Sequence, residues 1–248
     1  MKKDFAYAHL APWYEYLSDD CDYENWSQYF VNLLKSVSCD PAGKKGIDLG
    51  CGSGYFARSF SRLGAAMTGV DISAEMLSVA EEKTREEGLC ITYMQGDLSK
   101  FKTFEKYDFA CAANDLFNYV PKNRLLPALK NAARLLKKGG AFVFDISSKR
   151  KFLTKIRGKV SADDREDITY LSFGNVENDV ATLDVTLFIR RKDGAFDRFD
   201  EVHTQYIYEK EEIACALSAA GFDPVIATGM YGEDENTADR LCFLAVKK

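Results

Sequence analysis

An α/β fold is predicted, with a doubly wound and mostly parallel sheet of seven strands. Over residues 45–146, short apolar segments alternate with segments of helical periodicity, which is typical of parallel strands joined by crossover helices. The first apolar segment runs directly into a glycine-rich turn at residues 46–54. After residue 147, polar and apolar residues alternate instead, which predicts an inserted antiparallel β-meander.

The first part of the chain is expected to contain five strands and three helices. The strands are expected near residues 45–49, 66–70, 90–94, 107–112 and 140–146, and the helices near 55–63, 74–87 and 122–137. Ser73 is suited to cap the second helix, because serine accepts from free helix N–H groups, and Gly88 is suited to end it. The lysines and glycines of residues 137–140 are expected to end the third helix.

The second part of the chain is expected to add the meander and to complete the sheet. Turn signals divide residues 165–208 into three antiparallel strands, 168–173, 181–190 and 196–208. A helix is expected over 209–220, followed by strands near 223–228 and 241–246. Open α/β sheets bind ligands at the carboxyl ends of their strands, and we expect the meander to lie over these ends.

The glycine-rich turn indicates what kind of ligand the chain binds. Gly50, Gly52 and Gly54 permit positive φ and let a flat ligand approach the main chain. A dinucleotide site requires a further glycine where Tyr55 stands, and a P-loop requires a lysine that is absent. Carboxylates flank the turn, Asp48 within the first strand and Asp71 at the end of the second. Because carboxylates bind cations and hydroxyl groups, the turn favours a phosphate-free nucleoside with a cationic tail, such as S-adenosylmethionine.

Four motifs, in order and spacing, resemble those of class I S-adenosylmethionine-dependent methyltransferases. They are residues 47–54, 71–73, 96–98 and 114–115. The resemblance implies a Rossmann-like methyltransferase fold. It also implies that S-adenosylmethionine is the cofactor, S-adenosylhomocysteine its product, and that no metal is needed.

The resemblance also assigns the cofactor site. In that family the glycine turn lies under the methionine part of the cofactor, the residue matching Asp71 binds the ribose hydroxyls, and the residue matching Asp97 holds the adenine amino group with the next backbone amide. The implied cofactor-binding residues are Asp48, Gly50, Cys51, Gly52, Asp71, Ile72, Met76, Asp97, Leu98, Asn114 and Asp115.

Looser similarities point to one branch of the family. The insertion and the aromatic segments at residues 11–14 and 23–26 look like the small-molecule branch, which includes glycine and sugar-amine N-methyltransferases and bacterial late-competence-operon methyltransferases. In that branch the N-terminal helices fold over the cofactor, so Tyr14 and Trp26 are candidates to close the site. The alternative is that both aromatic side chains only pack in the core.

The resemblance suggests how a single domain of residues 1–248 is divided. We expect an N-terminal helical lid over 1–40, a cofactor-binding core over 41–146, an inserted meander over 147–208 that roofs the acceptor, and the final helix and strands over 209–248. A chain of this length buries one substantial core, and a second domain is unnecessary.

Three residues are candidates for direct roles beside the transferred methyl group. Methyl transfer from a sulfonium is an in-line displacement, so the protein mainly has to position the two reactants. Asn118 and Tyr119 follow the fourth strand and can hydrogen-bond to an acceptor; alternatively, Asn118 caps the next helix and Tyr119 packs in the core. His203 could receive the acceptor's proton, although strand histidines are often structural.

Composition restricts the partners. The formal charge of −5 argues against nucleic acid, and no apolar run long enough to cross a membrane is present, so a cytoplasmic protein is expected. Seven scattered cysteines and two histidines suggest neither a disulfide framework nor a zinc site. Six basic residues in segment 147–159 are either a solvated surface or a contact for an anionic substrate. The chain is expected to be a monomer or a homodimer.

The sequence therefore predicts an S-adenosylmethionine-dependent methyltransferase that acts on a nitrogen or oxygen of a small molecule. A non-catalytic S-adenosylmethionine sensor is the alternative, and it would lack an open acceptor cavity beside Asn118 and His203. An NAD-dependent oxidoreductase is disfavoured by Tyr55.

Overall fold

The computed structural model describes the backbone of residues 4–5 and all of residues 7–248. A sheet of seven strands has the order β11-β12-β6-β5-β2-β3-β4. Its strands are β2 (Lys45–Leu49), β3 (Ala66–Asp71), β4 (Thr92–Gln95), β5 (Tyr107–Ala112), β6 (Leu136–Ser147), β11 (Phe222–Gly229) and β12 (Arg240–Lys247). Strands β2 to β6 pair in parallel, whereas β12 is antiparallel to both β6 and β11. The predicted seven-stranded, mostly parallel sheet is confirmed.

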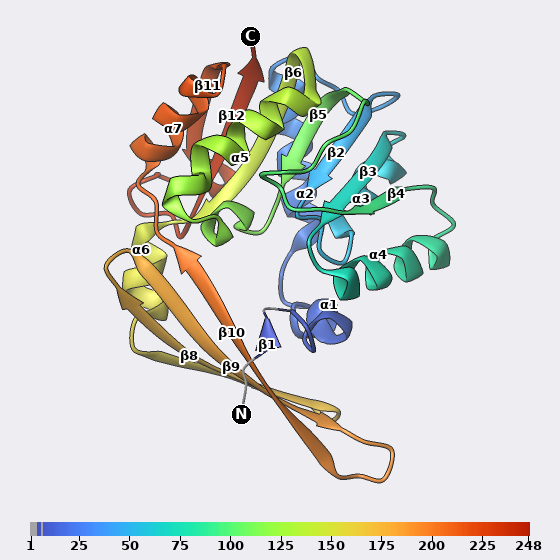
Figure 1. Cartoon of the computed structure of the whole chain (residues 1–248), viewed down its shortest axis with the longest axis vertical. Coiled ribbons are helices and arrows are strands. Elements are labelled where there is room, and N and C mark those ends of the chain that lie inside the picture. Colours follow the sequence, from blue (N-terminus) through green and yellow to red (C-terminus); the bar gives the residue numbers. More distant parts are fainter. Residues whose placement is uncertain (1–3, 6) are drawn as a thin grey trace.

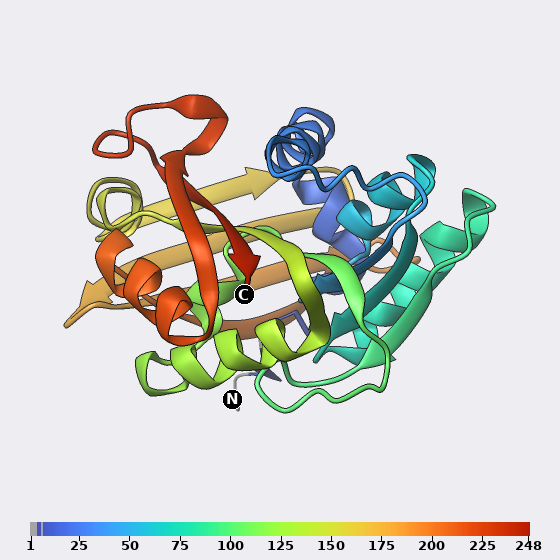
Figure 2. The ribbon, with the colours of Figure 1, turned by 90° about the horizontal axis from the view of Figure 1, so that it is seen from above.

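Helices cover both faces of this sheet, as the view from above shows (Figure 2). They are α2 (Tyr23–Ser36), α3 (Tyr55–Arg62), α4 (Ala74–Glu86), α5 (Lys122–Leu135) and α7 (Lys210–Ala219). Helices α5 and α7 bury their apolar residues against one face, and α2 and α3 bury theirs against the other. Ser73 caps α4 as predicted, since its Oγ accepts from the N–H of Met76 at 3.1 Å.

One boundary in this sheet differs from expectation. The chain enters β6 directly after α5, so the lysines and glycines of 137–140 belong to the strand and are not a helix stop. Leu136 already has extended backbone angles, with φ −83° and ψ 151°. The pairing of β6 with β5 is irregular over this stretch, because Tyr107 lies opposite Leu136 and Phe109 opposite Ala141.

A second sheet lies below the carboxyl ends of the parallel strands (Figure 1). Its order is β1-β10-β9-β8-β7, with β1 (Asp4–Phe5), β7 (Lys159–Asp164), β8 (Ile168–Glu177), β9 (Val180–Arg190) and β10 (Phe196–Tyr206). Helix α6 (Lys149–Lys151) and the π-helix η3 (Phe152–Ile156) connect it to β6. The insertion was expected to contain three strands; it contains four, all antiparallel, and β1 adds to its edge in parallel.

The lid prediction assumed that the first 40 residues are helical, but this segment also contains a strand. It holds β1, the short helices η1 (Ala11–Trp13) and α1 (Tyr14–Leu17), and α2. Helix α2 packs on the large sheet with α3. Strand β1 belongs to the edge of the small sheet, and η1 and α1 lie between the two sheets (Figure 1). The segment before α2, together with Tyr23 at the start of α2, is therefore the part of the N-terminal region that can cover a ligand.

Candidate active site

The glycine turn joins β2 to α3 in a conformation that its glycines make possible. Gly50, Gly52 and Gly54 have φ of 66°, 52° and 81°. A Cβ on Gly50 would lie 2.4 Å from Leu116 Cδ1, and one on Gly54 would lie 2.4 Å from Tyr93 Oη. At Gly52, by contrast, a Cβ would meet nothing within 4 Å, because this glycine faces open space. The turn therefore packs tightly at its ends and is bare in the middle.

Asp71, at the end of β3, fixes the middle of this turn. Its Oδ2 accepts from the N–H of Gly52 at 2.8 Å, and its Oδ1 accepts from the N–H of Ser73 at 2.9 Å. Burial raises the pKa of the Asp71 carboxyl. Two adjoining cavities, of about 200 and 170 Å³, meet at this residue, and we call them together the turn crevice.

One end of the turn crevice carries a carboxylate oxygen that lacks a partner. The side chain of Asp48 is 1% exposed, and its Oδ2 has no hydrogen bond to any described residue. Burial, together with the nearby Asp71, raises the pKa of Asp48 to about 7. Buried carboxylates are stabilised by cations or hydrogen-bond donors. Together with the bare surface at Gly52, this orphaned oxygen fits the cationic amino-acid tail of S-adenosylmethionine.

The other end of the turn crevice is lined by Asp97 and Leu98. The Oδ1 atom of Asp97 accepts from the N–H of Ser99 at 2.8 Å, and its Oδ2 accepts from Nη2 of Arg124 at 2.9 Å. These hydrogen bonds contribute to lowering the pKa of Asp97 although partial burial opposes them. Oδ1 also accepts from Ser99 Oγ at 2.7 Å, so it is Oδ2, with one hydrogen bond, that retains acceptor capacity.

A larger cavity of about 1000 Å³ lies between the two sheets, and we call it the inter-sheet cavity. It shares Tyr7, Tyr14, Asn114 and Tyr119 with the turn crevice. Its far wall includes His203, Gln205 and other side chains of the small sheet. A ligand in the turn crevice and a second molecule in the inter-sheet cavity would thus share one wall.

Comparisons with known proteins identify the family. A model of the methyltransferase domain matches residues 47–140. The putative methyltransferase YqeM of Bacillus subtilis (strain 168) is 30% identical over 247 residues, covering 97% of each chain. The chain belongs to the class I S-adenosylmethionine-dependent methyltransferases.

Two solved structures agree with this assignment. An S-adenosylmethionine-dependent methyltransferase from Clostridium acetobutylicum ATCC 824 superposes with a TM-score of 0.85 and 26% identity, over 95% of this chain and 96% of that one. The sugar N-methyltransferase KedS8 from Streptoalloteichus sp ATCC 53650 has the same fold, with a TM-score of 0.84 and 20% identity over 100% of this chain and 96% of its own.

Most of the predicted cofactor residues of the methyltransferase line the turn crevice. Eleven do so: Tyr14, Asp48, Gly50, Cys51, Gly52, Asp71, Ile72, Met76, Asp97, Leu98 and Asn114. Nδ2 of Asn114 donates to the hydroxyl of Tyr14. Asp115 was expected there as well but faces the inter-sheet cavity, where it accepts from Ser147 Oγ at 2.6 Å.

The structure corrects the prediction for Trp26. This residue lies on the buried face of α2, is 6% exposed and packs against Phe30 and Phe56. It lines neither cavity, because the helical stripe that carries it faces the core. Tyr23, from the same helix, lines the turn crevice in its place.

The structure also corrects the prediction for Asn118, which is fully buried and lines neither cavity. Its Nδ2 donates to the carbonyl of Tyr206 at 2.9 Å, and its Oδ1 accepts from the N–H of Ser147 at 2.9 Å. The amide therefore ties β6 to the end of β10 and has no free face for an acceptor. Tyr119 and His203, in contrast, both line the inter-sheet cavity.

Asp145 and Arg240 support the junction of the two cavities, and the sequence did not reveal them. Asp145 is fully buried and accepts from the N–H groups of Asn114 at 2.8 Å and Asp115 at 3.0 Å. Arg240 forms an ion pair with the same carboxylate. Asn114 and Asp115 both have positive φ, 58° and 54°, so this carboxylate holds a strained turn at the junction of the two cavities.

Two further findings concern partners. No helix in residues 4–5 and 7–248 has the length and apolarity needed to span a membrane. Within the same residues, no group of three or more His, Cys, Asp or Glu side chains is arranged to hold a metal ion.

Proposed function

We propose that this methyltransferase transfers a methyl group to an amine or hydroxyl of a small molecule held in the inter-sheet cavity. The observation that carries the proposal is the open space of about 1000 Å³ beside Tyr119 and His203, which adjoins the turn crevice. A sensor without catalysis would have no use for this second space. The shared fold of the sugar N-methyltransferase KedS8 is compatible with a small acceptor.

In this proposal each end of the turn crevice binds a different part of S-adenosylmethionine. Asp48 and Gly52 receive the amino-acid tail, Asp71 accepts from the ribose hydroxyls, and Asp97 with Leu98 receives the adenine. The cofactor supplies the methyl group, which is activated because it is bonded to a sulfonium. Tyr14 and Asn114 then lie where both ligands meet and keep the acceptor in line with that group.

A labelling experiment tests the proposed function. The protein is incubated with methyl-labelled S-adenosylmethionine and an extract of small metabolites, and the labelled product is identified by mass spectrometry. We expect the label in a product small enough for the inter-sheet cavity. Label found only in protein or nucleic acid would contradict the small-molecule acceptor.

The affinity for S-adenosylhomocysteine should depend on pH through Asp48. Its pKa lies at about 7, so the carboxyl is mostly neutral below that pH and ionised above it. The ammonium group of the ligand prefers the ionised form. We therefore expect the Kd to increase about tenfold as the pH falls from about 7.5 to about 6, measured by calorimetry. Asp48→Asn is the control and should remove this dependence; an equal slope in both proteins would exclude Asp48 as the group responsible.

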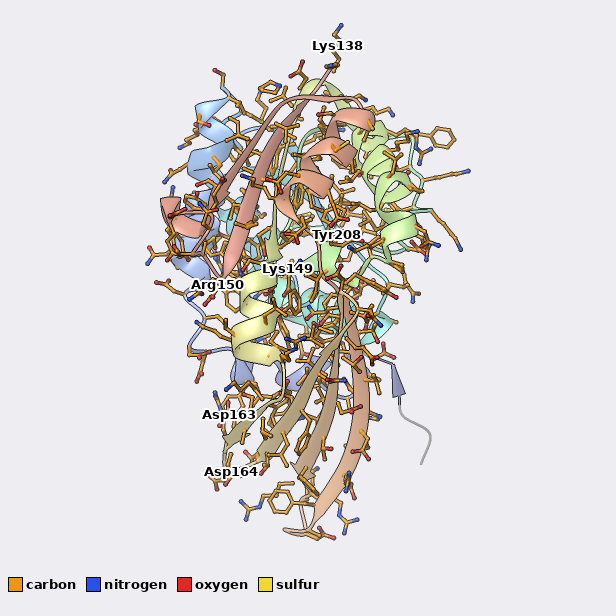
Figure 3. All side chains as sticks on the ribbon, turned by 90° about the vertical axis from the view of Figure 1, so that its left-hand side faces the viewer. Lys138, Lys149, Arg150, Asp163, Asp164 and Tyr208 are labelled. Atoms are coloured by element: carbon orange, nitrogen blue, oxygen red, sulfur yellow. The ribbon has the colours of Figure 1, made fainter. Side chains whose placement is uncertain are left out.

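The basic segment at residues 147–159 contributes to the inter-sheet cavity, which supports an acceptor with an anionic group. Lys149 pairs with Glu209, and Arg150 pairs with Asp239; both project from α6 (Figure 3). Lys151 lines the cavity, donates to Ser147 Oγ at 3.0 Å and forms no ion pair with a described residue. Burial lowers its pKa.

We expect Lys151→Met to increase the KM for the acceptor about tenfold or more, because one charge-assisted hydrogen bond to a ligand contributes about 1.5–3 kcal/mol. The Kd for S-adenosylhomocysteine should stay the same. Lys149→Met is the matched control, since Lys149 does not line the cavity. The measurement uses the acceptor recovered in the labelling experiment. Equal KM values in the two variants would show that the acceptor does not contact Lys151.

A further inference from the structure

Four side chains form a continuous line of hydrogen bonds along one wall of the inter-sheet cavity. The hydroxyl of Tyr7 is 2.9 Å from the hydroxyl of Tyr119, which is 3.2 Å from Nδ1 of His203. Nε2 of the same imidazole is 3.1 Å from Oε2 of Glu201. Tyr119 lines both the turn crevice and the inter-sheet cavity, so one end of the line lies where the two ligands of the proposed reaction meet.

Glu201 determines the direction of these hydrogen bonds. It is fully buried, and its carboxylate accepts from the backbone N–H groups of Tyr7 at 2.9 Å, His9 at 2.6 Å and Leu10 at 3.1 Å. Burial acts to raise the pKa of Glu201, but the hydrogen bonds from His203 and these backbone groups outweigh it and lower the pKa. An ionised carboxylate can only accept. Nε2 of His203 must therefore carry the proton that lies between them.

The tautomer of His203 then sets the role of Tyr119. A neutral imidazole has one donor and one acceptor nitrogen, so with Nε2 protonated its Nδ1 is the acceptor. Burial raises the pKa of the Tyr119 phenol well above its ordinary value, so the phenol keeps its proton and donates it to Nδ1. The phenol oxygen of Tyr119 then acts as the acceptor in its second hydrogen bond, and the donor is Tyr7 or a ligand. Every hydrogen bond in the line consequently points toward Glu201.

We propose that Tyr119, His203 and Glu201 form a proton relay that takes up the proton of the acceptor group. The inference rests on the proposed function. The acceptor's N–H or O–H gives its proton to Tyr119 Oη while the phenol proton passes to Nδ1 of His203, which becomes an imidazolium beside the Glu201 carboxylate. The freed electron pair of the acceptor forms the bond to the methyl carbon, and the broken C–S pair stays on sulfur. Tyr119 is the catalytic residue, and Glu201 is a positioning residue.

The tautomer of His203 can be measured without knowing the acceptor. The chain has two histidines, His9 and His203, so ¹⁵N-histidine labelling gives two ring systems, and His9→Gln assigns them. In the protein with S-adenosylhomocysteine we expect His203 to be protonated at Nε2 and not at Nδ1 at about pH 8. In Glu201→Gln the amide can donate to Nε2, and we expect the tautomer to reverse. A wild-type protein with Nδ1 protonated would overturn the relay.

A second measurement compares the rate of label transfer from methyl-labelled S-adenosylmethionine to the metabolite extract. Tyr119→Phe should lower this rate about 100-fold or more while the Kd for S-adenosylhomocysteine and the Nε2 tautomer remain. Tyr16→Phe is the matched control at an exposed position outside both cavities. Transfer at the wild-type rate in Tyr119→Phe would overturn the relay and leave the proposed function intact. A wild-type chain that binds S-adenosylhomocysteine but labels no metabolite would overturn the proposed function and the relay with it.

Discussion

Replacing Asp71 by alanine is expected to weaken the binding of S-adenosylhomocysteine about 100-fold or more. The proposed contact is a pair of hydrogen bonds from the ribose hydroxyls to one carboxylate, and each charge-assisted bond contributes about 1.5–3 kcal/mol, where 1.4 kcal/mol corresponds to a factor of ten. The substitution also releases the N–H of Gly52, which Asp71 holds at 2.8 Å in the middle of the turn. Isothermal titration calorimetry measures the effect directly.

The matched control for this variant is Asp193→Ala. Asp193 is an exposed carboxylate in the connection between β9 and β10 and lines neither cavity. The Asp193→Ala variant loses the same charge away from the cavities, so its Kd for S-adenosylhomocysteine should equal that of the wild type. An Asp71→Ala protein that remains folded by circular dichroism and keeps its affinity would remove Asp71 from the ribose site.

Asp145→Ala is expected to lower the free energy of unfolding by about 3–5 kcal/mol, because it leaves the partner of a buried ion pair uncompensated. Arg240 is that partner, and its side chain is 17% exposed. The variant also deprives the N–H groups of Asn114 and Asp115 of their acceptor. Urea unfolding measures this loss, and the m-value should be the same in the variant and the wild type.

A double variant separates the two causes of this loss. In Asp145→Ala/Arg240→Ala the unpaired cation is gone, so the double variant should recover part of the free energy of unfolding. The loss that remains reflects the turn at residues 114–115, whose N–H groups lack their acceptor. A loss below about 1 kcal/mol in the single variant would contradict the proposed importance of the buried pair.

The large sheet could be predicted because its signals are local. Each parallel strand is a short apolar run next to a helix with its own cap or stop, and the glycine turn marks where the first strand ends. Strand β7 gave no such signal, since residues 159–164 carry charges and are mostly exposed on an edge of the small sheet. Strand β1 is two residues long and exists only through its pairing with β10, far away in the sequence.

The lining of the cavities was predictable to the same extent. Asp71 and Asp97, which belong to local motifs at strand ends, line the turn crevice as expected. Residues that are brought together from distant segments were not predicted. Glu201 and Tyr7 are separated by 194 positions in the sequence. One local signal was available: Glu201, His203 and Gln205 alternate on a buried face of β10, where polar side chains are costly unless they have partners. Asp145 likewise stands out as a carboxylate in the apolar stretch 141–146 of β6.

In the proposed reaction, the wall that the turn crevice shares with the inter-sheet cavity makes the binding of the two ligands thermodynamically coupled. Tyr7, Tyr14, Asn114 and Tyr119 belong to both spaces, so occupancy of one changes the surface offered to the other. Linkage then requires reciprocity: the factor by which bound nucleoside alters the affinity for the second molecule equals the factor in the opposite direction. Dissociation constants measured for either compound alone therefore differ from those of the ternary assembly by that common factor.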